Sequence, residues 1–155
     1  MKYKIYIGAD HRGVIFKTKV VRFLSELGYP VVDVGSFDET TPCDYPAISF
    51  DVATRVAKDP KARGILICLT GVGHSIAANK VKGAYAALCH SKETAILSRQ
   101  HNNANILVLG ANFVRGKTML DVIKVWLATE FEGGRHLRRI NQIKAMEKKL
   151  FKSVK

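Results

Sequence analysis

The sequence lacks the features that mark membrane and secreted proteins. No apolar run approaches the ~20 residues that span a bilayer, and the first eight residues, Met1–Gly8, lack the apolar core of a secretion signal. Cysteine is scarce: Cys43, Cys68 and Cys89 are an odd three without CxxC spacing. We therefore expect no membrane partner, reduced thiols and a cytoplasmic location.

Acidic residues are also few, with 13 Asp and Glu against 25 Lys and Arg, for a net charge of +12. The segment Arg135–Lys155 alone holds eight Lys or Arg and a single acid, Glu147. Such a segment can bind nucleic acid or a membrane surface. The basic residues, however, flank an apolar series at helical spacing: Ile140, Ile143, Met146 and Leu150. We therefore favour a solvated helix face over a nucleic-acid partner.

Two glycine motifs are incomplete. Gly8–Gly13 has the glycine spacing of a P-loop, but Val14-Ile15 stands where Lys-Ser/Thr is required. Gly71-Val72-Gly73 begins like a dinucleotide fingerprint, yet Ile76 replaces the third glycine and the motif follows the third predicted strand. These departures argue against a nucleoside triphosphatase and against NAD binding.

Strand and helix patterns alternate along the whole chain. Apolar runs predict strands at 2–8, 31–34, 64–68, 84–88 and 106–110, and helical spacing predicts helices at 14–27, 46–57, from 73, 91–103, 118–129 and after 134. This order predicts a single α/β domain, 1–155, built as a three-layer α/β/α sandwich with a five-stranded parallel, Rossmann-like sheet. Ligands of such sheets gather at the carboxyl ends of the strands.

The stretch Cys68–Lys80 is the centre of the predicted site. A buried strand ends on a thiol, runs into a turn with two glycines, and a helix is expected to begin near Gly73. Unpaired N–H groups and the helix dipole at such a turn can hold an anion, and the same field favours a thiolate. Cys68 is thus a candidate base or nucleophile; the alternative is a packed small residue.

Other polar residues follow strand ends and can share this crevice. Asp10-His11 follows the first strand, and Gly110-Ala111-Asn112 follows the fifth. His101-Asn102 instead precedes the fifth strand, at the opposite edge, so it joins the crevice only through an unusual helix placement or from another subunit. A thiol, an anion-binding turn, two histidines and an arginine pair suit proton transfer on a small phosphorylated substrate.

Five ordered motifs carry a resemblance to a known family. They are Gly8-Ala9-Asp10-His11, Asp44-Tyr45-Pro46, Gly64–Cys68 with Ser75–Lys80, Ser98-Arg99-Gln100-His101-Asn102, and Glu132-Gly133-Gly134-Arg135-His136. With these motifs the chain resembles the ribose-5-phosphate isomerase B family, which includes allose- and galactose-6-phosphate isomerases.

The resemblance implies a homodimer, or a dimer of dimers, whose C-terminal helix extends to the partner and whose sites lie across the interface. It implies cofactor-free, metal-free aldose–ketose isomerisation through a cis-enediolate. Cys68 would move the proton between C2 and C1, and His101 would open the sugar ring with help from Asp10. The turn formed by Thr70, Gly71, Val72 and Gly73 would hold the oxyanion.

The resemblance also implies the sugar-phosphate contacts. Arg135 and Arg139, one helical turn apart, would grip the phosphate together with His11, while Asn102 and Tyr45 would position the sugar. Structural alternatives remain: Asp10 caps a helix, His101 is a partner of a helix C-terminus, the arginines are surface charge, and Tyr45 only packs.

Three residues depart from the family pattern. Leu69, beside the base, replaces a glycine or small residue, so it narrows the sugar pocket or reshapes the turn. Asn112 stands where the family commonly has a phosphate-binding arginine, for which Arg115 is a candidate substitute. His74 takes a position where members without the cysteine carry a glutamate base. We expect it to neighbour the substrate or to tune the ionisation of Cys68.

Three functions follow as hypotheses. The first is interconversion of ribose 5-phosphate and ribulose 5-phosphate. The second is isomerisation of a six-carbon 6-phosphate sugar, against which Leu69 argues. The third is a non-catalytic module that binds phosphosugars or polyanions.

Overall fold

The computed structural model describes residues 2–151 and confirms the alternating order of strands and helices. The strands are β1 (Lys4–Ala9), β2 (Val31–Asp33), β3 (Ala62–Cys68), β4 (Ala86–Leu88) and β5 (Ile106–Gly110). The helices are the 3-10 turn η1 (His11–Gly13), α1 (Val14–Glu26), α2 (Tyr45–Lys58), α3 (Val72–Ala78), α4 (Lys92–Asn102), α5 (Gly116–Ala128) and α6 (Gly134–Leu150). None of the helices within 2–151 is long and apolar enough to cross a membrane.

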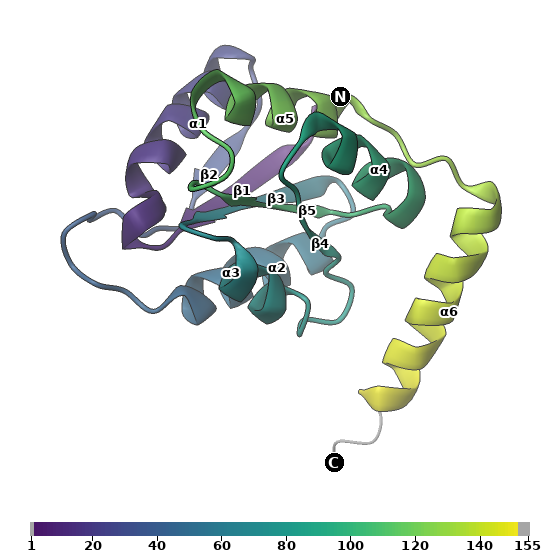
Figure 1. Ribbon diagram of the computed structural model, residues 1–155. Coiled ribbons are helices and arrows are strands. Elements are labelled where there is room, and N and C mark those ends of the chain that lie inside the picture. Colours follow the sequence, from purple (N-terminus) through teal and green to yellow (C-terminus); the bar gives the residue numbers. More distant parts are fainter. Residues whose placement is uncertain (1, 152–155) are drawn as a thin grey trace.

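The five strands form one parallel sheet in the order β2-β1-β3-β5-β4 (Figure 1). The register pairs Ala9 with Ile67 and Cys68 with Gly110. The central strands therefore end together, and the loops that follow them share one edge of the sheet, as the sequence predicts.

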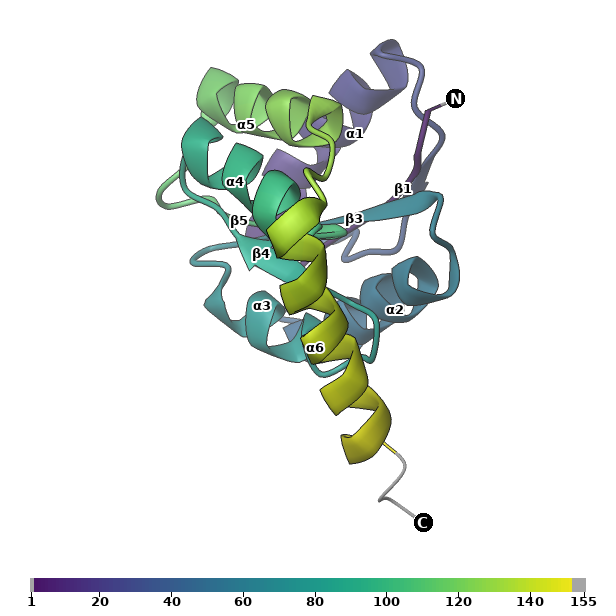
Figure 2. The same ribbon diagram turned by 90° about the vertical axis from the view of Figure 1, so that its right-hand side faces the viewer.

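Helices cover both faces of the sheet. α1, α4 and α5 lie on one face, and α2 and α3 lie on the other (Figures 1 and 2). Alternate strand residues point into the two resulting cores: Ile65 and Ile67 belong to the core that includes Trp126 of α5, and Leu66 to the core that includes Val52 of α2. This is the predicted three-layer sandwich.

Element ends follow local side-chain chemistry. Ser91 caps α4 in a reciprocal capping box with Thr94, as predicted for Ser91, and Pro46 occupies the first turn of α2. Several boundaries differ from the sequence-based ones, among them the following three starts. β1 and β4 each begin two residues later, and α3 begins at Val72 because Gly71, in the left-handed conformation (φ 83°), ends the preceding turn.

The terminal helix α6 stands off from the sandwich (Figure 1). His136 and Ile140 are its buried residues, and its one acid, Glu147, accepts hydrogen bonds from the Gly83 N–H (3.1 Å) and the Tyr85 hydroxyl (3.2 Å). Large apolar side chains of its other faces remain exposed: Leu137, Ile143, Met146 and Leu150. Lys152 and Lys155 of the predicted basic segment lie outside the described residues.

The edge strand β4 is closed by a side chain from the segment after α3. The Asn79 amide donates to the Ala86 carbonyl and accepts from the Ala86 N–H, both at 2.9 Å. Asn79 thus substitutes for a neighbouring strand.

We expect Asn79→Ala to lower the free energy of unfolding by about 1 kcal/mol, measured by urea denaturation. The adjacent exposed Lys80→Ala is the matched control; equal stability losses in the two variants would contradict this role.

Candidate active site

Cys68 is the last residue of β3 and lies at the carboxyl edge of the sheet. It is 7% exposed, and its Sγ accepts a hydrogen bond from the Gly71 N–H at 2.9 Å. Burial raises the pKa of this thiol and the nearby Asp10 carboxylate adds to the rise, while hydrogen bonds from Gly71 and Thr70 lower the pKa. The net direction is upward. The turn thus favours the thiolate, as expected, but burial has the larger effect on the pKa.

The turn after Cys68 is held against the loop that follows β5. The Ala111 N–H donates to the Cys68 carbonyl (2.8 Å), and the Asn112 N–H donates to the Leu69 carbonyl (3.0 Å). Thr70 and Val72 are exposed, and Leu69 is half-buried beside the thiol. The turn is thus fixed at its base and open at its tip.

Asn112 and Arg115 share this edge of the sheet. The Arg115 guanidinium donates to the Asn112 side-chain oxygen (3.1 Å) and to the Ala111 carbonyl (2.6 Å). Both side chains are exposed. Arg115, the candidate substitute for the arginine that the family commonly has at position 112, therefore lies in the same loop as Asn112.

Asp10 and His11 complete this first group of residues. Asp10 Oδ1 accepts from the Gly13 N–H (3.0 Å), as in the structural alternative for this residue, and its charge also acts on Cys68. His11 Nδ1 accepts from the Cys43 N–H at 3.3 Å. That bond leaves Nε2 of His11 as the nitrogen for any ligand.

Tyr45 and His74 pack behind the turn. The Tyr45 ring lies over Gly73, where a Cβ would come within 2.6 Å of it, so a larger residue there would have to displace the ring. His74 is fully buried, meets the Tyr45 ring edge-on at 5.7 Å, and its Nδ1 lies 2.6 Å from the Ser49 hydroxyl. The side chain of His74 has no exposed atom, so its role beside the substrate or in tuning Cys68 stays a prediction.

The remaining predicted residues form a second group at the other end of the sheet. α4 starts beyond the carboxyl end of β4 and runs back, so His101 and Asn102 lie just before β5 begins. β5 alone separates this end from Cys68 by roughly 13 Å along the sheet. Arg135 and Arg139, both exposed on α6, belong to this group. One chain therefore does not bring His101 and Cys68 together, as the sequence indicates.

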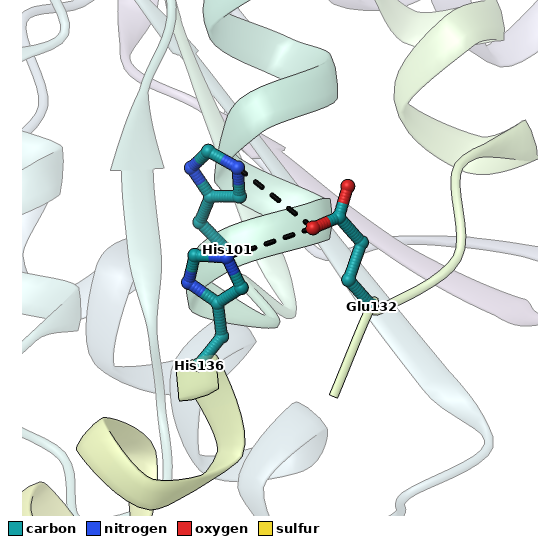
Figure 3. A group of neighbouring side chains, drawn as sticks. All are labelled: His101, Glu132 and His136. Carbon is teal, nitrogen blue, oxygen red and sulfur yellow. Dashed lines mark ion pairs between the residues drawn. The ribbon is translucent and has the colours of Figure 1, made fainter. Parts of the chain in front are cut away.

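His101 lies in a cluster that sequence reasoning did not identify (Figure 3). Its ring stacks on that of His136, with centroids 4.2 Å apart and planes 9° apart. One Glu132 oxygen lies 4.0 Å from His101 Nε2 and 3.5 Å from His136 Nε2. Among the described residues, these are the group of three whose ligand atoms, all within 4.8 Å, can hold a metal ion. The sequence signal for this cluster was the four-residue spacing of Glu132 and His136 in the motif Glu132-Gly133-Gly134-Arg135-His136.

His136 is the fixed member of this cluster. It is 5% exposed, and the Arg135 Nε donates to its Nε2 at 3.4 Å. Burial lowers its pKa, and the nearby His101 and Arg135 lower it further. His136 thus accepts a hydrogen bond at Nε2, which is the role of a neutral ring.

Comparison with known proteins gives one consistent family. Residues 5–143 match the ribose/galactose isomerase family. A probable ribose-5-phosphate isomerase B of Mycoplasma genitalium is 45% identical over 96% of this chain and 98% of its own length. The ribose-5-phosphate isomerase B of Escherichia coli is 42% identical over 94% and 97%.

Solved structures agree with this result. Ribose-5-phosphate isomerase B of Clostridium thermocellum superposes with a TM-score of 0.90 at 46% identity, covering 95% of this chain and 99% of that one. The Mycoplasma genitalium enzyme with bound ribulose 5-phosphate superposes with a TM-score of 0.92 at 45% identity, covering 96% and 98%.

His74 makes stability depend on pH. Burial lowers its pKa from 6.5 to about 4, so the folded state resists a proton that the unfolded chain accepts. The free energy of unfolding therefore has its full value above pH 6.5 and decreases as the pH falls toward 4, by up to about 3 kcal/mol. We expect His74→Met to flatten the free energy of unfolding over this range, measured by denaturant titration at each pH. The exposed His90→Gln is the control and should keep the wild-type slope.

Proposed function

The chain belongs to the ribose/galactose isomerase family, and we propose that it interconverts ribose 5-phosphate and ribulose 5-phosphate. The observation that carries the proposal is the Cys68 thiol, held at the carboxyl edge of the sheet beside the amides of an open turn. The Mycoplasma genitalium relative with bound ribulose 5-phosphate supports the choice of substrate. Leu69, half-buried beside the thiol, favours a five-carbon over a six-carbon sugar. We also propose a cytoplasmic location, supported by the three free thiols.

Cys68 is the proposed base. As thiolate it removes the proton from C2 of the open-chain aldose, and the electron pair forms the C1–C2 double bond of a cis-enediolate while the aldehyde oxygen gains the charge. The proton of the C2 hydroxyl passes to the O1 oxyanion, the same sulfur returns its proton to C1, and C2 becomes the carbonyl. One carbon is reduced as its neighbour is oxidised, so the step needs no outside oxidant. The N–H groups of Val72 and Gly73, at the open tip of the turn, are the proposed oxyanion donors.

The second chain of a homodimer supplies His101, Asn102, Arg135 and Arg139 of the proposed site, and the chain with Cys68 supplies Asp10, His11 and Tyr45. His101 would open the sugar ring with Asp10, Asn102 and Tyr45 would position the open chain, and Arg135 and Arg139 would bind the phosphate together with His11. Two features support this arrangement. The two groups lie at opposite edges of the sheet within one chain, and α6 exposes an apolar series suited to a second copy.

We expect Cys68→Ser to lower kcat for ribose 5-phosphate by about 10²–10⁴-fold with a smaller change in KM, because the hydroxyl is a far poorer base. Since burial raises the pKa of the thiol, wild-type kcat/KM should also increase with pH through the neutral range. Ribulose 5-phosphate formation measures both. Cys89→Ser, in the core, is the matched control. Wild-type turnover by Cys68→Ser would remove the proposed base.

A mixed dimer tests whether the site is shared. Cys68→Ser and His101→Asn should each be inactive alone. In a heterodimer isolated with two affinity tags, one of the two sites pairs an intact Cys68 with an intact His101, so about half of the wild-type activity should return. A heterodimer as inactive as its parents would show that each site lies within one chain.

A further inference from the structure

We propose that His101, Glu132 and His136 bind a divalent transition-metal ion such as zinc or cobalt, and that this ion inhibits the enzyme. The inhibition rests on the proposed function, because a His101 that binds the metal ion no longer opens the sugar ring. The binding of the ion does not rest on it. The ion is an inhibitor here and has no part in the isomerisation.

The ligand set determines the kind of ion. Two imidazole nitrogens and one carboxylate oxygen suit zinc, cobalt, nickel or copper, whereas magnesium and calcium take mainly oxygen ligands. Three protein ligands with one position left for water or another ligand are typical of open zinc sites. Glu132 and His101 are partly exposed, so an ion can reach the cluster from solvent.

The spacing is close to that of a metal site. Metal–ligand bonds of about 2.0–2.1 Å in tetrahedral geometry place ligand atoms roughly 3.4 Å apart. The Glu132 oxygen lies 3.5 Å from His136 Nε2 and 4.0 Å from His101 Nε2. The two rings are parallel, so their lone pairs do not yet converge. His101, with 36% of its side chain exposed, has room to rotate toward the buried His136.

Arg135 makes metal and sugar phosphate compete. Its Nε donates to His136 Nε2, the lone pair that a metal ion needs. An ion therefore has to displace the Arg135 guanidinium from His136 and repels it afterwards. Since Arg135 and His101 are also proposed substrate ligands, bound ion and bound sugar phosphate require different positions of the same side chains.

Cobalt titration of the chelator-treated full-length protein tests the site without any assay of turnover. Tetrahedral Co²⁺ with nitrogen and oxygen ligands absorbs in the visible, and a background with Cys43→Ser and Cys68→Ser removes the half-buried thiol and the thiol of the proposed site. We expect Glu132→Gln, which alters an exposed side chain, to weaken cobalt binding at least about tenfold. The matched control is Glu130→Gln, an exposed acid two residues away. Equal cobalt affinity in the two variants would overturn the site.

Zinc inhibition tests the second half of the proposal. Each variant with intact Cys68 is assayed against its own uninhibited rate. Zinc should inhibit the wild type and Glu130→Gln alike, Glu132→Gln should need at least about tenfold more zinc, and ribose 5-phosphate should protect. Cobalt binding at Glu132 without zinc inhibition would overturn the inhibitory role. A protein without isomerase activity that still binds cobalt through Glu132 would overturn the proposed function and leave the site intact.

Discussion

The parallel arrangement of the strands determines at which end of the sheet each functional side chain lies. Each strand runs the same way, so every connecting helix has to return to the starting edge before the next strand begins. Cys68 ends β3, whereas His101 ends the helix that returns to the start of β5. No side-chain rearrangement within a single chain bridges that length of sheet. A site that needs both residues is therefore a site between two chains.

The same edge of the sheet determines how reactive the thiol is. At the end of a buried strand Cys68 is largely removed from water, which disfavours the thiolate, while the Gly71 and Thr70 amides act in the opposite direction. Burial is the larger effect. A base with a raised pKa is protonated more of the time but removes a proton from carbon more readily once ionised. The hydrogen bonds from the turn thus partly offset the effect of burial on the pKa of Cys68, and the thiolate remains the minor form.

The fold was predictable from the sequence because its signals are local. Apolar runs of strand length, Ser91 at a helix start and Pro46 in a first turn each specify an element without reference to distant residues. The position of His101 at the opposite edge also follows from strand order alone. The ionisation of Cys68 and the burial of His74 were not predictable, since both depend on packing between α2, α3 and the sheet.

The His101–Glu132–His136 cluster was also not predictable from the sequence, although two of its members are close together in the chain. Glu132 and His136 are four residues apart, yet Gly133 and Gly134 both have positive φ, so the chain turns sharply into α6 between them. The Glu132 N–H also donates to the Gln100 carbonyl, which joins this turn to the end of α4. The contact between α4 and α6 thus stacks the two histidines and orients the carboxylate. Because the same turn begins the helix that carries Arg135, the position of the proposed phosphate-binding arginine and that of His136 are set by one piece of backbone.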